Sequence, residues 1–518
     1  MRTRFRLLSL LLTTAGWGGV LCAASPDFNV ADYGAVGDGR TPATAAIQRA
    51  IDACAAAGGG RVVLPAGTFR SGPVFLRSNV DFHLSPGAVL AGSENFADYP
   101  AIDGRWEGIE RKIHASLLTA LNATNVAITG EGTLDCHGAP WWAAALEVKR
   151  LRQEQGIKER EPDNPPGAPL AYPRPRAIYL QDCRKVRLSG ITILNSPSWN
   201  IHPVYCDDVV IDGVTITAPA KSPNTDGIDP DSCRNVRIAN CRIGCGDDGI
   251  IIKSGYNADG RRVGRVCEDI VITNCVIGPA IAAVGIGSET SGGVRNVTVS
   301  NCVFDGAYNG LRVKSGRGRG AFVEDFRADN IVMRNLGGEA LSITTYYDSK
   351  DRTPHPVDEG TPVFRHLAWS NLTIDGARDA GVIEGLPERY LEDVRLDHVV
   401  VRHVRRGLSA VFVDGLHLSD WDLDGPEKSA VTVEQSRNVR FSSVNPMQPP
   451  AGAPFARFVD VDGAVVRHCT PPAGTAVFLQ LAGSGTKGVV LQANWLAGAA
   501  RPTELTDGAA PGELTVVP

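Results

Sequence analysis

The sequence lacks several features that are typical of other classes of protein. After residue 21 no apolar run is long enough to cross a membrane. Few segments show the apolar pattern of a long amphipathic helix. No paired Cys-x-x-Cys arrangement has the spacing of a zinc site, so we expect neither a metal nor a cofactor. The net charge of −5 gives no general attraction to nucleic acid. These absences favour a soluble protein rich in β-strands.

The N-terminus has the pattern of a secretory signal peptide. Three arginines in the first six residues precede an apolar run from Leu7 to Leu21, and Cys22-Ala23-Ala24 places small residues where a signal peptidase cleaves. The apolar run is short for a membrane span. We therefore expect a signal peptide over residues 1–24, no membrane attachment after its removal, and a secreted or periplasmic protein.

A short strand-like phrase recurs along the chain and indicates a solenoid. Its copies alternate apolar and polar residues, as half-buried strands do. Periods of 20 to 50 residues with one strand phrase per repeat are typical of the coils of a parallel β-helix. The spacings of 23, 27, 34 and 27 residues separate Val186, Val209, Val236, Ile270 and Val297. Hairpin turn signals do not recur at a steady pace, which disfavours an up-and-down barrel.

The segments around these coils suggest how the chain is divided. An apolar stripe between residues 46 and 54 predicts a helix with Thr41 as its N-cap and Pro42 at its first position, which would cover the open end of the solenoid. Residues 139–176 interrupt the repeat and predict a loop insertion on the binding face. The expected parts are an N-terminal cap with the first coils (25–100), a catalytic β-helix (101–445), and C-terminal coils or an irregular tail (446–518).

Eleven of the 12 cysteines follow the expected signal peptide. Export permits disulfides, and the spacing of Cys241 and Cys245 is compatible with a short bridge. However, several cysteines follow asparagine at repeated positions, as Cys241, Cys275 and Cys302 do. This pattern favours small apolar residues stacked inside successive coils.

Three aspartates stand beside glycines at a spacing of about one coil. Asp226 closes the phrase Asn-Thr-Asp that begins at Asn224, and Asp247 and Asp248 follow 21 and 22 residues later in Gly-Asp-Asp-Gly. We therefore expect the three carboxyl groups side by side on one wall. Crowded carboxylates repel one another, so packing alone rarely selects them. They suit acid–base cleavage of a glycosidic bond, in which one group holds a proton and another activates water.

Basic and aromatic residues follow along the same wall. Arg312 and Lys314 are two residues apart on a predicted strand, so both face one side and suit a substrate that carries a carboxylate. A structural role is the alternative for each aromatic or histidine candidate. Further candidate substrate-binding residues are Asn224, His202 and the tandem Tyr346-Tyr347, and Lys253, Arg317 and Arg319 extend the predicted basic rim.

The ordered set Asn-Thr-Asp, Gly-Asp-Asp and Arg-x-Lys resembles glycoside hydrolase family 28, the pectin-cleaving polygalacturonases and rhamnogalacturonan hydrolases. The resemblance extends from Phe28 to Asp348 and includes the entry phrase Asp-Tyr-Gly-Ala at residues 32–35. It implies an all-β fold, a single-stranded right-handed parallel β-helix with an N-terminal capping helix. We expect a monomeric enzyme whose partner is pectin, an acidic plant cell-wall polysaccharide, or its oligosaccharides.

The resemblance also implies a role for each matching residue. Asp247 resembles the general acid, and Asp226 and Asp248 resemble the pair that activates water for attack with inversion of configuration. Arg312 and Lys314 resemble the residues that hold the galacturonate carboxylate. The expected reaction is hydrolysis of α-1,4-galacturonosyl linkages.

One departure from the resemblance leaves the substrate and the reaction open. Polygalacturonases usually carry Gly-His-Gly between the aspartate pair and Arg-x-Lys, whereas residues 278–289 contain no histidine and Ile281 or a neighbour takes its place. Rhamnogalacturonan hydrolases also lack this histidine, so rhamnogalacturonan is the alternative substrate. A pectate-lyase-like enzyme, in which the aspartates would bind Ca²⁺, and a non-catalytic polysaccharide-binding β-helix are two further hypotheses.

Overall fold

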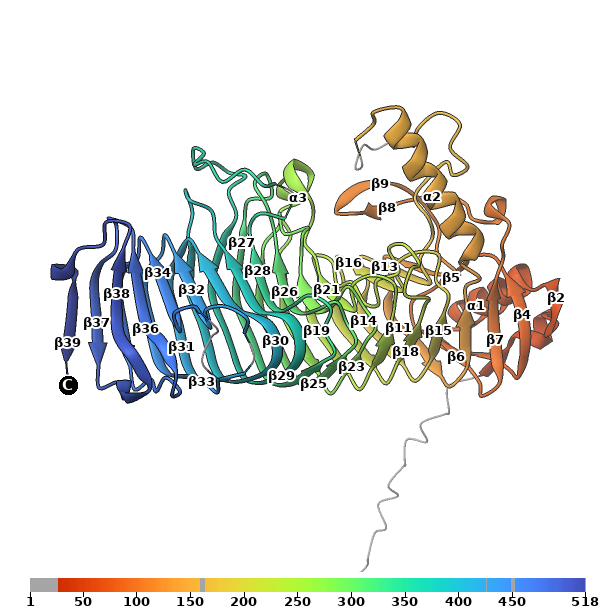
Figure 1. The fold of residues 1–518 in the computed structure, drawn as a ribbon. Helices are drawn as coiled ribbons and strands as arrows, with labels where there is room; N and C mark the ends of the chain where they lie inside the picture. The colour runs from red at the N-terminus through yellow and green to blue at the C-terminus, as the bar shows by residue number, and fades with distance from the viewer. Residues whose placement is uncertain (1–26, 159–163, 348, 425, 449–451, 518) are drawn as a thin grey trace, which may run out of the picture.

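The computed structural model describes residues 27–158, 164–347, 349–424, 426–448 and 452–517. The predicted signal peptide lies outside these residues. The described chain winds into an elongated solenoid whose coils lie side by side (Figure 1). Parallel pairing joins most strands into one 33-stranded sheet, so the predicted right-handed parallel β-helix is confirmed.

The first face of the solenoid is a stack of parallel strands that runs its whole length, because each coil adds one strand in register with the last. The stack consists of β1 (Asp27–Asn29), β3 (Gly60–Leu64), β6 (Val80–Leu84), β11 (Thr124–Gly130), β14 (Arg184–Ser189), β17 (Asp207–Asp212), β19 (Arg234–Ala239), β22 (Cys267–Thr273), β25 (Val294–Asp305), β27 (Phe322–Arg334), β29 (Val363–Glu384), β30 (Leu391–Val411), β31 (Val413–Leu423), β33 (Arg437–Pro446), β35 (Asp462–Arg467), β37 (Lys487–Gln492) and β39 (Leu514–Val517).

A second face is shorter and merges with the first at β25. It consists of β2 (Asp38–Pro42), β4 (Gly67–Ser71), β7 (Ala88–Gly92), β12 (Thr133–Asp135), β15 (Thr192–Leu194), β18 (Thr215–Thr217), β20 (Arg242–Gly244) and β23 (Val276–Ile277). From β25 to β33 long strands bend through both faces.

The third face carries the predicted site. It begins with β5 (Val74–Leu76), β10 (Leu118–Leu121), β13 (Ile178–Gln181) and β16 (Ile201–Val204), and the isolated bridge residue Ile228 links Ile201 to Ile250 at the start of β21. The stack continues through β21 (Ile250–Ile252), β24 (Ala282–Ile286), β26 (Asn309–Lys314), β28 (Glu339–Thr344), the C-terminal parts of β29 and β30, β32 (Val431–Glu434), β34 (Ala456–Val459), β36 (Thr475–Ala482) and β38 (Ala499–Thr506). The described residues after 446 thus form further coils.

The repeat read from the sequence sets the register of the coils. Val186 pairs with Val209, Val209 with Val236, Val236 with Ile270, and Ile270 with Val297. All five side chains are buried in one continuous apolar core. The unequal repeat lengths are therefore absorbed by the loops between strands, while the inward-facing residues stay aligned.

Helix α1 (Thr44–Ala56) covers the N-terminal end of the core, as predicted. Its apolar stripe is buried, but the predicted N-cap is wrong. Thr41 and Pro42 end strand β2, because the N–H and hydroxyl of Thr41 both bond to the Asp38 carboxylate. Ala43 precedes the helix without a side-chain cap.

Two insertions rise on the same side of the solenoid (Figure 1). The predicted insertion contains α2 (Ala139–Glu154), and β13 is the next element along the chain. An antiparallel hairpin, β8 (Ala101–Trp106) and β9 (Ile109–His114), stands beside it and was not predicted. Its Glu110 contacts the short helix α3 (Asn257–Val263) through Asp259 and Arg262. No helix in the described ranges is long and apolar enough to cross a membrane.

The cysteines stack inside the coils. All eleven from Cys54 to Cys469 are buried and carry free thiols, so the bridge between Cys241 and Cys245 does not form. Asn240, Asn274 and Asn301, each just before a cysteine, take a left-handed backbone conformation with φ between 55° and 57°. Asparagine tolerates this conformation better than most residues, so each coil turns at the same place.

Candidate active site

The structure brings the three predicted aspartates together. Asp226 lies in the turn before the bridge residue Ile228, and Asp247 and Asp248 lie in the turn before β21. One carboxylate oxygen of each aspartate lies within 4.8 Å of those of the other two. At this separation the three cannot all be ionised without cations close by.

Asp248 is the ionised member of the cluster. The ammonium group of Lys314, at the end of β26, donates to its Oδ2 over 2.7 Å, and the Ala282 N–H donates to its Oδ1 over 3.0 Å. Burial alone would raise the pKa of Asp248, but the charges of Lys314 and Lys253 outweigh it and lower the pKa below its usual value. Asp248 can therefore accept a proton.

Asp247 is the member that can donate a proton. It is half-buried and lines an open cleft. Burial and the charge of Asp248 raise the pKa of Asp247 to about 6, despite the opposing charges of Lys314 and Lys253. A carboxyl group with this pKa holds its proton in mildly acidic solution, as a general acid must.

Asp226 is almost fully buried, with an exposed fraction of 3%. Burial and the neighbouring Asp247 and Asp229 raise its pKa well above the usual value, and Lys253 opposes this. In the free protein the pair therefore holds one protonated carboxyl group, Asp226, and one ionised carboxylate, Asp248. The ionised carboxylate can act as the general base.

The predicted cationic pair lies beside Tyr347. The Arg312 guanidinium carbon and the Lys314 ammonium lie 5.6 and 5.0 Å from the centre of the Tyr347 ring. Tyr347 is 40% exposed, whereas Tyr346 is 8% exposed and contacts Arg317 and Arg352. The sequence pattern did not separate the two tyrosines of the tandem; strand β28 ends at Thr344, and the turn that follows brings Tyr347 beside the cations.

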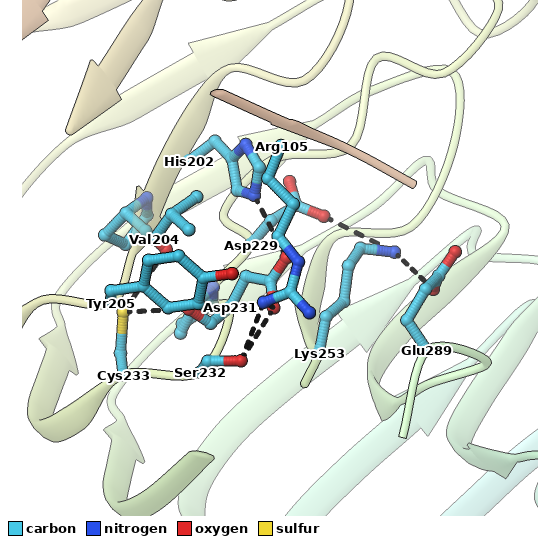
Figure 2. Close-up of polar contacts among 12 residues, drawn as sticks. Arg105, His202, Val204, Tyr205, Asp229, Asp231, Ser232, Cys233, Lys253 and Glu289 are labelled. Atoms are coloured by element: carbon cyan, nitrogen blue, oxygen red, sulfur yellow. Dashed lines mark hydrogen bonds and ion pairs between the residues drawn. The ribbon is translucent and has the colours of Figure 1, made fainter. Parts of the chain in front are cut away.

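Asn224 and His202 lie in different surroundings. Asn224 is half-buried in the cleft, and its side-chain oxygen accepts a 2.7 Å hydrogen bond from Arg174 of the insertion. His202 is fully buried, with Nε2 3.6 Å from Asp231, and burial lowers its pKa to about 3 (Figure 2). In this structure the His202 side chain has no exposed surface with which to contact a sugar.

The predicted basic rim does not form from Lys253, Arg317 and Arg319. Lys253 is buried beneath the aspartates, Arg317 pairs with Glu388, and Arg319 is buried against the Ser288 carbonyl oxygen. Arg317 and Arg319 follow the end of β26, so the strand pattern did not fix where their side chains point.

A cleft of about 640 Å³ extends from Asp247 toward the insertions. Hairpin β8–β9 and helix α2 both contribute to its lining. Ile281, at the position where the resemblance expects histidine, also lines it. The cleft has more cations than anions, with Arg111, Lys149, Arg152, Arg174 and Lys221 against Glu107 and Asp247. This charge suits an acidic ligand although the whole chain is acidic.

In the described part of the chain, the three aspartates are the only group of three potential metal ligands. The ammonium groups of Lys314 and Lys253 lie 2.7 Å from Asp248 and 3.8 Å from Asp226. A divalent cation bound there would meet like charge, so the residues present fit a metal poorly.

Comparison with known proteins identifies the family of this chain. Residues 54–376 match the family model described as glycosyl hydrolases family 28. A "Probable polygalacturonase" from Vitis vinifera is 32% identical over 76% of this chain and 77% of its own length. An "Endo-polygalacturonase" from Pectobacterium carotovorum subsp. carotovorum is 32% identical over 64% of this chain and 76% of its own length.

A solved structure is similar over most of the chain. The hyperthermoactive exopolygalacturonase from Thermotoga maritima has a TM-score of 0.69 and 33% sequence identity, and the match covers 77% of this chain and 91% of that one. The chain belongs to glycosyl hydrolases family 28. It is a polygalacturonase-like glycoside hydrolase.

Proposed function

We propose that the protein is an exported enzyme that hydrolyses α-1,4-galacturonosyl linkages of pectin with inversion of configuration. The observation that carries this proposal is the cluster of one proton-donating and one ionised aspartate, Asp247 and Asp248, beside the cations Arg312 and Lys314. The similar proteins from Vitis vinifera, Pectobacterium and Thermotoga maritima are named as polygalacturonases. The signal-peptide pattern supports export, and we propose a secreted or periplasmic monomer.

In the proposed reaction Asp247 donates its proton to the glycosidic oxygen as the bond to the anomeric carbon breaks. A water molecule attacks this carbon from the opposite face, and ionised Asp248 accepts the proton that the water loses. Protonated Asp226 hydrogen-bonds the water and fixes its direction. One proton leaves Asp247 and one arrives at Asp248, so proton exchange with solvent restores the starting state.

Arg312, Lys314 and Tyr347 are proposed to bind the sugar that carries the leaving oxygen. Arg312 offers two N–H donors to a carboxylate, and the exposed Tyr347 ring offers a face for the sugar. Lys314 also donates a hydrogen bond to Asp248, so the same ammonium group would contact both the acidic sugar and the proposed base. A neutral sugar in this place would leave the Arg312 charge uncompensated.

We further propose exo action, in which the enzyme releases sugars from one chain end. Hairpin β8–β9 and helix α2 line the same cleft as Asp247, and both rise above the N-terminal part of the solenoid (Figure 1). Cleavage within a polymer would require a cleft that is open at both ends, so that the polymer can extend beyond the site in both directions. Size analysis of early products tests this proposal: galacturonate or a single short oligomer supports it, and a mixture of long oligomers contradicts it.

One observation favours a second substrate. Ile281 replaces a polar imidazole with an apolar side chain in the cleft, and this suits the methyl group of a rhamnose unit. Reducing ends should therefore be measured with polygalacturonate and, separately, with rhamnogalacturonan backbone. Release from polygalacturonate supports the proposal, and release only from the alternating polymer supports a rhamnogalacturonan hydrolase instead.

A further inference from the structure

A buried ion cluster adjoins Asp226, and no step of the proposed reaction uses its members Lys253, Asp229 and Glu289 (Figure 2). Its centre is Lys253, directly after β21, which has an exposed fraction of only 4%. The Lys253 ammonium group lies 3.3 Å from Glu289, 3.7 Å from Asp229 and 3.8 Å from Asp226. Three carboxylates from two separate loops thus surround one cation.

The fold holds this lysine firmly in place. Lys253 bridges to Asp231, its N–H donates to the Pro230 carbonyl oxygen, and its own carbonyl oxygen accepts from the Ser232 N–H. The ammonium group also lies 5.0 Å from the centre of the Trp199 ring. Burying the charge of this ammonium group costs free energy unless the surrounding carboxylates are ionised and compensate it.

The carboxylates around Lys253 have few other partners. Asp226 Oδ1 and both oxygens of Asp229 are buried and accept no hydrogen bond from any described residue. Asp229 is fully buried. Lys253 is therefore the closest compensating charge for both aspartates, and Glu289 competes with them for it.

We propose that Lys253 is a positioning residue: its ammonium group, shared with Glu289, sets how many protons the aspartate cluster carries and so keeps its acid and its base in working form. This inference rests on the proposed function. It differs from the role of Lys314, which donates a hydrogen bond to Asp248 and lies 5.0 Å from the centre of the Tyr347 ring.

The other charges around the cluster are fixed by the same coils. The charged and titratable groups that face Lys253 and Asp226 are Asp229, Asp231, Glu289, Asp247, Asp248, Lys314, Arg174, Arg176 and His202. Asp231 is already paired with Arg105 at 2.9 Å. Carboxylates outnumber the cations near the reacting atoms, so removing one cation or one carboxylate should change the proton count.

Two single substitutions should shift the pH profile in opposite directions. Lys253→Met removes the cation, so the aspartates hold protons to higher pH and the whole profile of kcat moves upward by about one pH unit. Glu289→Gln removes a competing carboxylate, so the profile moves downward. Lys487→Met is the matched control, because this exposed lysine pairs with Asp462 far along the solenoid.

The test measures kcat against pH on polygalacturonate for the wild type and these variants, with thermal unfolding as a check of folding. Opposite shifts, with an unchanged profile for the control, support the proposal. Loss of stability without a shift in either folded variant would assign the cluster a purely structural role and overturn it. If Lys253→Met does not fold, an unshifted profile in Glu289→Gln overturns it. Absence of activity in the wild type on any pectic polymer would instead overturn the proposed function.

Discussion

Raising the pH from 5 to 7 should slow the enzyme, because Asp247 has to donate a proton. Burial and the charge of Asp248 place the pKa of Asp247 at about 6. With this pKa the protonated fraction falls from roughly nine-tenths at pH 5 to slightly under one-tenth at pH 7, so kcat should fall about tenfold. Above pH 7 the fall should approach tenfold for each further unit.

The assay is the initial rate of reducing-end release at saturating polygalacturonate, measured from pH 4 to pH 8. The sign is fixed by the role: a general acid is active when protonated, so its limb of the profile falls as the pH rises. Asp247→Asn removes the titrating proton, so the small residual kcat of this variant should no longer fall as the pH rises. A kcat that rises between pH 5 and pH 7, or an Asp247→Asn variant with the wild-type limb, would refute the assignment of Asp247 as the acid.

Four further predictions concern the base, the binding of the sugar, the core and the need for metal. Lys314→Met should lower kcat by about 10²-fold or more and move the acidic limb to higher pH, because the pKa of Asp248 rises without its cation; an unmoved limb would contradict this. Arg312→Ala should raise KM more than it lowers kcat in steady-state kinetics, and an unchanged KM would exclude carboxylate binding there. Ile270→Ala should lower the free energy of unfolding in urea by about 2–5 kcal/mol, whereas the exposed neighbour Val271→Ala should change it by less than about 0.5 kcal/mol. A chelator should leave the rate of reducing-end release unchanged, and loss of activity on chelation would favour a Ca²⁺-dependent lyase.

The fold could be predicted from the sequence because the solenoid repeats. Val209, Val236 and Ile270 mark the same inward position in successive coils, and the apolar alternation around them keeps this alignment although the repeats differ in length. The capping helix was predicted for a similar reason, from its apolar stripe. Its first residue was wrong because the bonds from Thr41 to Asp38 are local contacts that compete with helix capping.

The site was predicted where a coil spacing or a strand pattern fixes the position of a side chain. Asp226, Asp247 and Asp248 lie at the spacing of about one coil, and Lys314, two coils further on, was predicted from the strand alternation that it shares with Arg312. The role of Lys253 was missed, because its partner Glu289 comes from a loop of the next coil and a strand period cannot show what a loop covers. Hairpin β8–β9 was missed because its sequence has no repeat with which to compare it.

The stereochemistry of the first product separates inverting hydrolysis from every competing reaction. The measurement is proton NMR of a short oligogalacturonate during the first minutes of the reaction, before the anomers of the product equilibrate. The proposed mechanism predicts a saturated product that appears first as the β-anomer, since water attacks the α-linked carbon from the opposite face. A first product in the α-configuration, an unsaturated product, or no release from any pectic polymer by the folded protein would contradict it.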